Sequence, residues 1–314
     1  MRSLDLGERL LNGDRRACAR LITMLENNDN EAIDILRDLY KYSGNAYVIG
    51  VTGAPGSGKS TLTDKIVKEF RKKGKKIGIL AIDPTSPFTG GAILGDRIRM
   101  NDLTLDKNVF IRSMGTRGAL GGMSRATWGA VKVLDIFGMD YIFIETVGVG
   151  QSEIDIVKIA DTVLMVMVPN LGDDIQAIKA GIMEIADVFA INKSDLEGAD
   201  RTKLEIEMNL DLSEDKEYRP PVVKVSARQN KGIDDLIDKL MEHRRYLEDT
   251  GKIIERRKKN IKLEIMKLIE EELMSLIMDK AFRENLIEDL ANDVIAKETD
   301  PYTAKERLID LIKE

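Results

Sequence analysis

The segment at residues 53–60, Gly-Ala-Pro-Gly-Ser-Gly-Lys-Ser, constrains the fold of this chain more than any other feature. It matches the pattern G-x-x-x-x-G-K-S/T of phosphate-binding loops. The apolar run at 47–52 before it predicts a buried strand, and residues 62–73 after it predict an amphipathic helix. In such a strand–loop–helix unit, backbone N–H groups and the helix N-terminus point at a phosphate. The sequence therefore predicts a nucleoside triphosphate site, with a chance glycine-rich turn as the weaker alternative.

Within this loop, two side chains have separate expected roles. Lys59 is expected to reach the β- and γ-phosphates, and Ser60 is expected to place its hydroxyl on Mg²⁺. The residues of this segment predicted to bind the nucleotide are Ala54, Pro55, Gly56, Ser57, Gly58, Lys59, Ser60 and Thr61.

A second motif, N-K-S-D at 192–195, predicts that the base is guanine. Guanine presents N1–H and an exocyclic amine side by side, and the carboxylate of Asp195 can accept both hydrogen bonds. Adenine has no such pair of donors, so ATP would leave the carboxylate unpaired. Beyond the next predicted strand, at 222–225, a backbone N–H is expected to reach the guanine oxygen. The predicted guanine site consists of Asn192, Lys193, Asp195, Ser226 and Ala227.

Composition narrows the class of protein. The chain has 314 residues, of which 43% are hydrophobic and 32% charged, so it can bury a large core under a charged surface. Its net charge of −6 argues mildly against a general nucleic-acid binder. No run approaches the length of a membrane span, and with Cys18 as the one cysteine no internal disulfide is possible. We therefore expect a cytoplasmic protein without membrane or nucleic-acid partners, with Cys18 as a small buried side chain.

Strands and helices alternate through the middle of the chain. Apolar runs at 77–82, 109–111, 141–144, 162–168 and 188–191 join those already described, separated by helical patterns. Continuous apolar strands with helical crossovers predict an α/β fold, a mostly parallel sheet with helices on both faces. Three helices are expected before it, at 4–11, 15–26 and 30–42. The predicted division is a helical segment at 1–43, a P-loop domain at 44–248 and a helical arm at 249–314.

The predicted arm contains no strand-like run. Apolar residues recur at helical spacing along it, at Ile254, Ile261, Ile265, Leu268, Ile269, Leu273 and Leu276. A helix outside the sheet has to bury such a stripe, either on the N-terminal helices or on a second subunit, and we favour a dimerisation arm. The basic run at 256–259 is expected to be a charged solvent face because acidic residues surround it. His243 is likewise expected to be a solvated helix position.

Carboxylates follow two predicted strands between the two nucleotide motifs. Asp83 and Glu145 both stand at strand ends, where they could hold Mg²⁺ directly or through its waters. Gly148, three residues after Glu145, stands where a backbone N–H can sense the γ-phosphate. Each feature alone is also typical of a helix cap or an ion pair. Their joint occurrence favours loops that respond to the nucleotide.

The chain resembles the methylmalonyl-CoA mutase-associated GTPases, the MeaB/ArgK-like group of the SIMIBI class. The residues that carry the resemblance are E-T-V-G-V-G-Q-S-E at 145–153, G-A-I-L-G-D-R-I-R-M at 91–100 and N-K-S-D at 192–195. The resemblance implies a Mg²⁺ shell of Ser60, Asp83, Asp96 and Glu145. It also implies a second switch at 145–153 and a third at 169–181, with Lys179 reaching the nucleotide when the partner is bound. Asn170 and Leu171 depart from the glycines common in that third switch.

The resemblance also implies the activity. Members are homodimeric GTPases, converting GTP and water to GDP and phosphate, that gate cofactor loading and protection of an adenosylcobalamin-dependent acyl-CoA mutase, by default methylmalonyl-CoA mutase. Lys59, Asp96, Glu145 and Lys179 would carry the chemistry. Val149 stands where Ras-like proteins have a water-orienting glutamine, so we expect slow hydrolysis that a partner accelerates.

Two other functions share the fold class. A kinase that transfers the γ-phosphate of GTP or ATP, of the amino-acid transport type, would need a catalytic base, and no carboxylate beyond those of the Mg²⁺ shell stands out. A metallochaperone GTPase would need soft ligands, and Cys18 and His243 are far apart in the sequence.

Overall fold

The computed structural model describes residues 3–83, 101–115, 125–146, 155–169, 182–212, 217–283 and 285–311. The chain divides into two compact units, residues 1–258 and residues 259–314. The first unit contains the sheet and both nucleotide motifs.

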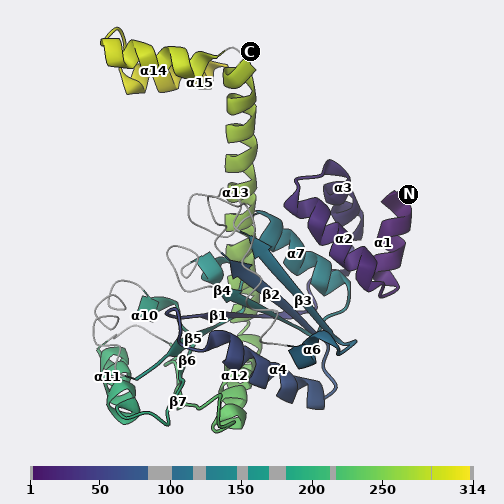
Figure 1. Cartoon of the computed structure of the whole chain (residues 1–314), viewed down its shortest axis with the longest axis vertical. Helices are drawn as coiled ribbons and strands as arrows, with labels where there is room; N and C mark the ends of the chain where they lie inside the picture. Colours follow the sequence, from purple (N-terminus) through teal and green to yellow (C-terminus); the bar gives the residue numbers. More distant parts are fainter. Residues whose placement is uncertain are drawn as a thin grey trace. The chain divides into compact units, whose positions relative to one another are not determined.

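A seven-stranded sheet forms the centre of the first unit, and every strand pair is parallel. The strand order is β3-β2-β4-β1-β5-β6-β7 (Figure 1). The strands are β1 (Tyr47–Thr52), β2 (Ile77–Asp83), β3 (Val109–Gly115), β4 (Tyr141–Thr146), β5 (Thr162–Met167), β6 (Val188–Ile191) and β7 (Val222–Lys224). All seven apolar runs are thus confirmed as strands, and β3 extends beyond its apolar run to Gly115.

Helices cover both faces of this sheet. In the first unit they are α1 (Ser3–Leu11), α2 (Arg15–Glu26), α3 (Asn30–Leu39), η1 (Tyr40–Tyr42), α4 (Lys59–Lys72), α6 (Asn101–Thr104), α7 (Arg125–Ile136), η2 (Ile156–Lys158), α10 (Ile182–Ile185), α11 (Ala199–Asp211), α12 (Ile233–Asp249) and the start of α13 (Lys252–Arg283). The side chains of Asp14 and Asp29 cap α2 and α3 by accepting backbone hydrogen bonds. The helix after the P-loop begins at Lys59, earlier than the apolar pattern predicts, because Gly58 provides a left-handed N-cap.

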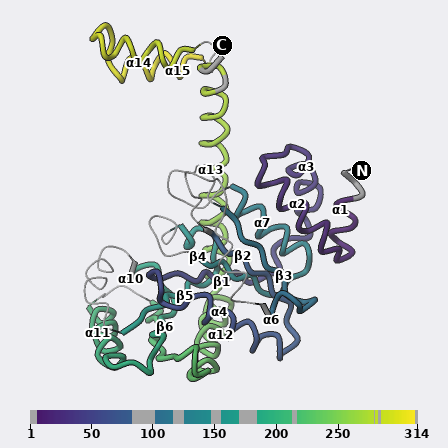
Figure 2. The backbone as a smooth tube through the Cα atoms, viewed as in Figure 1, coloured from purple at the N-terminus to yellow at the C-terminus, as the bar shows by residue number. Residues whose placement is uncertain are grey.

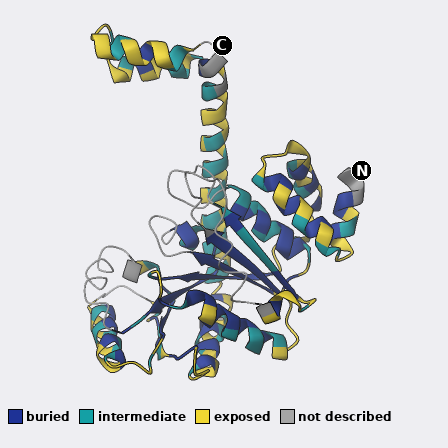
Figure 3. Cartoon of the chain, in the orientation of Figure 1, coloured by how far each residue is buried: buried dark blue, intermediate teal, exposed yellow. Residues whose placement is uncertain are grey.

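Alternate side chains of β1 enter two different cores, and a third core lies between β5, β6 and α11. Figure 3 shows most of the strands in the dark blue of buried residues. On β1, Val48 packs with helices α1, α2, α3 and α7, whereas Tyr47 and Ile49 pack with α4 and α12. The strand interiors are buried, as continuous apolar strands predict for a sheet covered on both sides. Cys18 lies in the first core, where burial raises the pKa of its thiol to about 12. A thiol with so high a pKa stays protonated at neutral pH, so Cys18 is a small packing side chain, as expected.

His243 is buried rather than solvated, contrary to the expectation from its basic neighbours. The side chain is 2% exposed, and its Nδ1 lies 2.8 Å from the Thr162 hydroxyl. The Tyr47 hydroxyl lies 2.5 Å from the same Thr162 oxygen. Burial lowers the pKa of His243, which favours the neutral ring. The expectation was wrong because it rested on the basic neighbours Arg244 and Arg245, whereas position 243 lies on the inward face of α12.

The basic run at 256–259 is also only partly a solvent face. Lys258 and Lys259 are exposed, as expected. Arg256 and Arg257 instead form ion pairs with Asp187 and Asp161, each with an N–O distance of 2.8 Å. The acidic partners lie about 70 and 96 residues away in the sequence, so local charge patterning did not reveal them.

The second unit contains the remainder of α13 together with α14 (Leu286–Ala296) and α15 (Pro301–Asp310) (Figure 2). Asp300 caps α15, accepting hydrogen bonds from the backbone of Tyr302 and Thr303. Ile261, Ile265, Ile269, Leu273 and Leu276 of α13 are all exposed. Within the described part of the chain, no helix combines the length and apolar character needed to cross a membrane.

Candidate nucleotide-binding site

The P-loop joins β1 to α4 and lies against the end of β5. Gly53 has φ of 138°, and a Cβ at this position would lie 2.1 Å from the carbonyl oxygen of Val166. Only glycine permits this conformation and this approach of two backbones. The first glycine of the motif was not among the predicted nucleotide ligands, and the structure gives it a packing role instead. The motif pattern itself was the signal that could have identified it.

Lys59 is the first residue of α4 and is 6% exposed. Its ammonium donates hydrogen bonds to the carbonyl oxygens of Gly53 and Ala54, at 2.6 and 3.0 Å. These bonds hold the positive charge inside the curve of the loop. A cation in this place, beside the N-terminus of α4, produces a site that favours a polyphosphate.

Ser60 and Glu145 meet although 85 residues separate them. The Ser60 hydroxyl donates to Oε1 of Glu145 at 2.5 Å, and both side chains are buried. Next to them, Thr146 donates to Thr52 at 3.1 Å between the ends of β4 and β1. This threonine pair was not predicted, and apolar strand patterning contains no signal for it. Hydroxyl and carboxylate oxygens are the ligands that Mg²⁺ prefers, so the Ser60–Glu145 pair fits this ion.

Four of the predicted site residues are not tested by this geometry. Asp96, Gly148 and Lys179 lie outside the described residues. Asp83 is the last residue of β2, a neighbour of β4 in the sheet, but its side chain is not described.

The Asn192 side chain links the two nucleotide motifs. Its Nδ2 donates to the carbonyl oxygen of Ser57 in the P-loop at 2.8 Å. Its Oδ1 accepts from the backbone N–H of Ala227 at 3.1 Å. The residue is 2% exposed, so these bonds satisfy a buried amide at both ends. Asn192 therefore fixes the distance between the P-loop and the Ser226–Ala227 turn.

The Lys193 side chain also contacts the P-loop. Its ammonium donates to the carbonyl oxygen of Gly56 at 2.9 Å, and its backbone adopts φ of 57°. A non-glycine residue with positive φ is strained, and a functional loop is a common place for it. The side chain is exposed, so its methylenes and charge remain available to a ligand beside the loop.

Asp195 and Ser226 lie together at the end of this loop. The Ser226 hydroxyl donates to Oδ1 of Asp195 at 2.5 Å, and this bond lowers the pKa of the carboxyl below its usual range. The positive charges of Arg228 and Lys231 act in the same direction. Asp195 is thus held as a carboxylate, the form that accepts hydrogen bonds from guanine.

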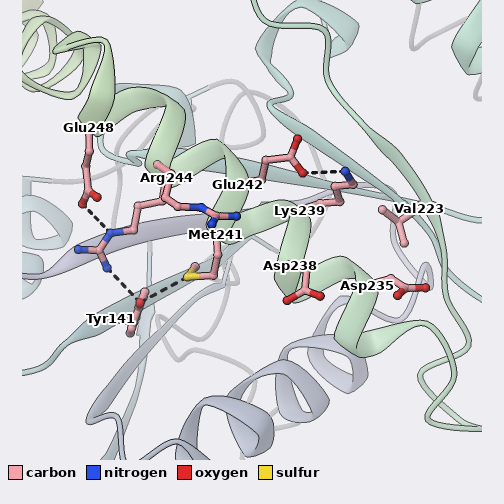
Figure 4. A pocket seen from close by; sticks show the side chains of 10 residues that line it. Tyr141, Val223, Asp235, Asp238, Lys239, Met241, Glu242, Arg244 and Glu248 are labelled. Carbon is pink, nitrogen blue, oxygen red and sulfur yellow. Dashed lines mark hydrogen bonds and ion pairs between the residues drawn. The ribbon is translucent and has the colours of Figure 1, made fainter.

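The structure therefore brings together the parts of the site that lay far apart in the sequence. The P-loop, the loop at 192–195 and the Ser226–Ala227 turn all follow the carboxyl ends of parallel strands, and Glu145 lies within the carboxyl end of β4. A hollow lined by residues of α12 with Tyr141 of β4 and Val223 of β7 contains none of the predicted ligands. Figure 4 shows Arg244 there, bonded to Glu248 and to the Tyr141 hydroxyl.

Comparison with known proteins agrees with this geometry. The family model described as methylmalonyl Co-A mutase-associated GTPase MeaB matches residues 18–281. A Pyrococcus abyssi protein named as a GTPase is 54% identical, covering 97% of this chain and 95% of its own. The Escherichia coli GTPase ArgK is 34% identical, covering 89% and 88%. The crystal structure of an LAO/AO transport system kinase is 26% identical, with a TM-score of 0.74, and covers 99% of this chain and 98% of its own.

The sheet, the P-loop and the guanine motif define a P-loop GTPase that binds GTP and GDP. The chain belongs to the MeaB family, as the family match and these relatives show. The expected resemblance and the expected fold class are both confirmed.

Two glycines of the P-loop give a matched test of the Asn192 contact. Gly56 and Gly58 have similar positive φ values, 74° and 86°. A Cβ at Gly58 would lie 2.5 Å from Nδ2 of Asn192, whereas a Cβ at Gly56 would meet nothing within 4 Å. We expect Gly56→Ala to lower the free energy of unfolding by about 1 kcal/mol through backbone strain. Gly58→Ala should cost about 3 kcal/mol because it also displaces a buried hydrogen-bonded amide.

Chemical denaturation of the two variants without nucleotide measures this difference. Equal losses would show that the alanine at 58 is accommodated and that the Asn192 contact does not constrain the loop.

Asp195→Asn tests the guanine site. An amide cannot accept both guanine donors, so GTP affinity should fall by about a hundredfold. Affinity for xanthosine triphosphate, which carries an oxygen in place of the exocyclic amine, should rise. Asp200→Asn is the matched control, because Asp200 is an exposed carboxylate on α11 that pairs with Lys224. Fluorescent-nucleotide titration gives both affinities, and an unchanged preference for guanine in Asp195→Asn would contradict the assignment.

Proposed function

We propose that this chain is a Mg²⁺-dependent GTPase whose hydrolysis cycle gates cofactor loading and protection of an adenosylcobalamin-dependent acyl-CoA mutase, with methylmalonyl-CoA mutase as the client. The observation that carries the proposal is the family match over residues 18–281, because the family is named for its association with that mutase. The guanine and phosphate motifs, assembled at one edge of the sheet, supply the GTP-dependent part of the activity.

The described residues support specific roles in this cycle. Ser60 and Glu145 would hold Mg²⁺, with Asp83 and Asp96 as the further ligands that the family resemblance implies. Bound there, the ion would neutralise charge on the β- and γ-phosphates. Lys59 would contribute a second positive charge, and Asn192 would hold the loop in the shape that receives the phosphates. Gly148 and Lys179 would respond to the γ-phosphate and to the partner.

We also propose that the protein is a homodimer formed through the C-terminal arm. The support is the exposed apolar row on α13, which includes Ile261, Ile265, Ile269 and Leu273. A row of this kind, repeating at helical spacing over more than three turns, is typical of a face that is covered in an assembly.

A second candidate function rests on the solved structure named as an LAO/AO transport system kinase. It predicts transfer of the γ-phosphate to an acceptor rather than to water. Incubation with γ-labelled GTP followed by phosphoamino-acid analysis of the protein distinguishes the two, because a GTPase releases all of the label as inorganic phosphate.

GTP turnover by the purified protein, with and without the mutase of the same organism, tests the proposed function. We expect slow hydrolysis alone and a severalfold increase with the mutase, because a partner would complete the catalytic site. Ser60→Ala should abolish both rates, since the metal would lose a ligand. A rate that does not respond to the mutase would leave the GTPase activity supported but would contradict the mutase as the client.

A truncated chain tests the dimer. The first compact unit ends at Lys258 and includes Arg256 and Arg257, so the chain should end there rather than at the predicted boundary near 248. We expect residues 1–258 to sediment as a monomer and to bind GTP as the full chain does. A dimer of this truncated protein would place the principal interface outside the arm.

A further inference from the structure

Two adjacent arginines attach the start of α13 to the sheet. Nη1 and Nη2 of Arg256 contact the two carboxylate oxygens of Asp187, at 3.0 and 2.8 Å. Nε and Nη2 of Arg257 contact the two oxygens of Asp161, both at 2.8 Å. The Arg257 pair has the parallel two-bond geometry in which a guanidinium binds a carboxylate most strongly. The Arg256 pair has one hydrogen bond and a second close N–O contact.

The carboxylates are themselves fixed to the backbone of the strands. Asp161 immediately precedes β5 and accepts from the N–H of Val48 in β1, at 2.9 Å. Asp187 immediately precedes β6 and accepts from the N–H of Val163 in β5, at 2.8 Å. Each arginine is therefore connected, through the aspartate with which it pairs, to the amino ends of two strands.

The remaining donors of the arginines bind backbone carbonyls. Arg257 donates to the carbonyl oxygens of Gly44 and Ala46, both at 2.9 Å. Arg256 donates to the carbonyl oxygen of Ala160, at 3.1 Å. Residues 44–46 connect the N-terminal helices to β1, so Arg257 joins this connection, β5 and α13 at one point.

His243 of α12 completes the cluster without adding charge. Its Nε2 lies 3.5 Å from Oδ1 of Asp187, and Nδ1 faces the Thr162 hydroxyl. The rings of Tyr218 and Tyr246 pack near it, with centroids at 4.8 and 6.3 Å. With a neutral His243, two arginines balance two aspartates, so this partly buried cluster leaves no charge unpaired.

Apolar packing contributes less to this attachment. Ile253 is partly buried against the second core, but Ile254 beside it is 71% exposed. Over the first two turns of α13, the described contacts with the sheet are therefore mainly the polar ones.

We propose that Arg256 and Arg257 form a clamp that fixes the first two turns of α13 to the amino ends of β1, β5 and β6. The opposite ends of these strands lead into the P-loop, the segment that begins at Pro169, and Asn192. The start of α13 is thus a rigid extension of the strands that carry the nucleotide loops. Arg256 and Arg257 are positioning residues, and their role is independent of which client the protein serves.

Hydrogen exchange on the full-length double variant Arg256→Lys, Arg257→Lys tests the clamp. Lysine keeps the charge but cannot form two parallel bonds to a carboxylate. Amides at residues 252–258 should exchange about tenfold faster or more, as expected when partly buried ion pairs are weakened. Exchange in the P-loop and GTP affinity should stay unchanged, which a general loss of stability would not allow.

Arg245→Lys is the matched control, because Arg245 is an exposed arginine on α12. It should leave the exchange of residues 252–258 at the wild-type rate. A double variant that also exchanges at the wild-type rate in this segment would overturn the proposal.

Single variants keep the test decisive if the double variant does not fold. Arg257→Lys, Asp161→Asn and their combination form a double-mutant cycle on one pair. Both single changes remove the same interaction, so the combination should accelerate exchange at 252–258 little more than the stronger single change. Independent, multiplying effects would show that the two side chains do not act together, and would overturn the clamp.

Discussion

The parallel direction of all described strands is the constraint on which the rest of the first unit depends. In a parallel sheet every strand has its amino end at one edge and its carboxyl end at the other. The P-loop, Asn192 and the Ser226–Ala227 turn follow carboxyl ends, and Glu145 lies within one. Asp161 and Asp187 precede amino ends. One edge is therefore the nucleotide site and the opposite edge is the attachment of α13.

At the nucleotide edge, short polar contacts set the spacing between loops. Asn192 bonds to the P-loop and to the turn at 226–227, and Ser60 bonds to Glu145. Gly53 and Gly58 permit these approaches because a Cβ at either position would collide with a neighbouring loop or strand. The site is thus preorganised by the protein itself, which favours stabilisation of charge that develops during phosphoryl transfer.

At the opposite edge, the partly buried charged groups are all paired. Arg256 and Arg257 each meet a carboxylate that is already bonded to strand backbone, and His243 stays neutral beside them. An isolated charge in this position would be costly, whereas a balanced and hydrogen-bonded group is tolerated and specifies one geometry. The start of α13 is connected to the nucleotide loops through this group and three strands.

The sequence by itself determined the class of fold, the positions of all seven strands and the identity of the base, because apolar periodicity and short motifs are local signals. It also predicted that Lys59, Ser60, Asn192 and Asp195 belong to one nucleotide site. Only the tertiary structure decided that His243 is buried and that Arg256 and Arg257 pair with Asp187 and Asp161. These contacts join residues far apart in the chain, and the residues that flank each of them are charged and polar. A local pattern cannot distinguish such a side chain from a solvated one, because the partner that permits its burial is supplied by another strand.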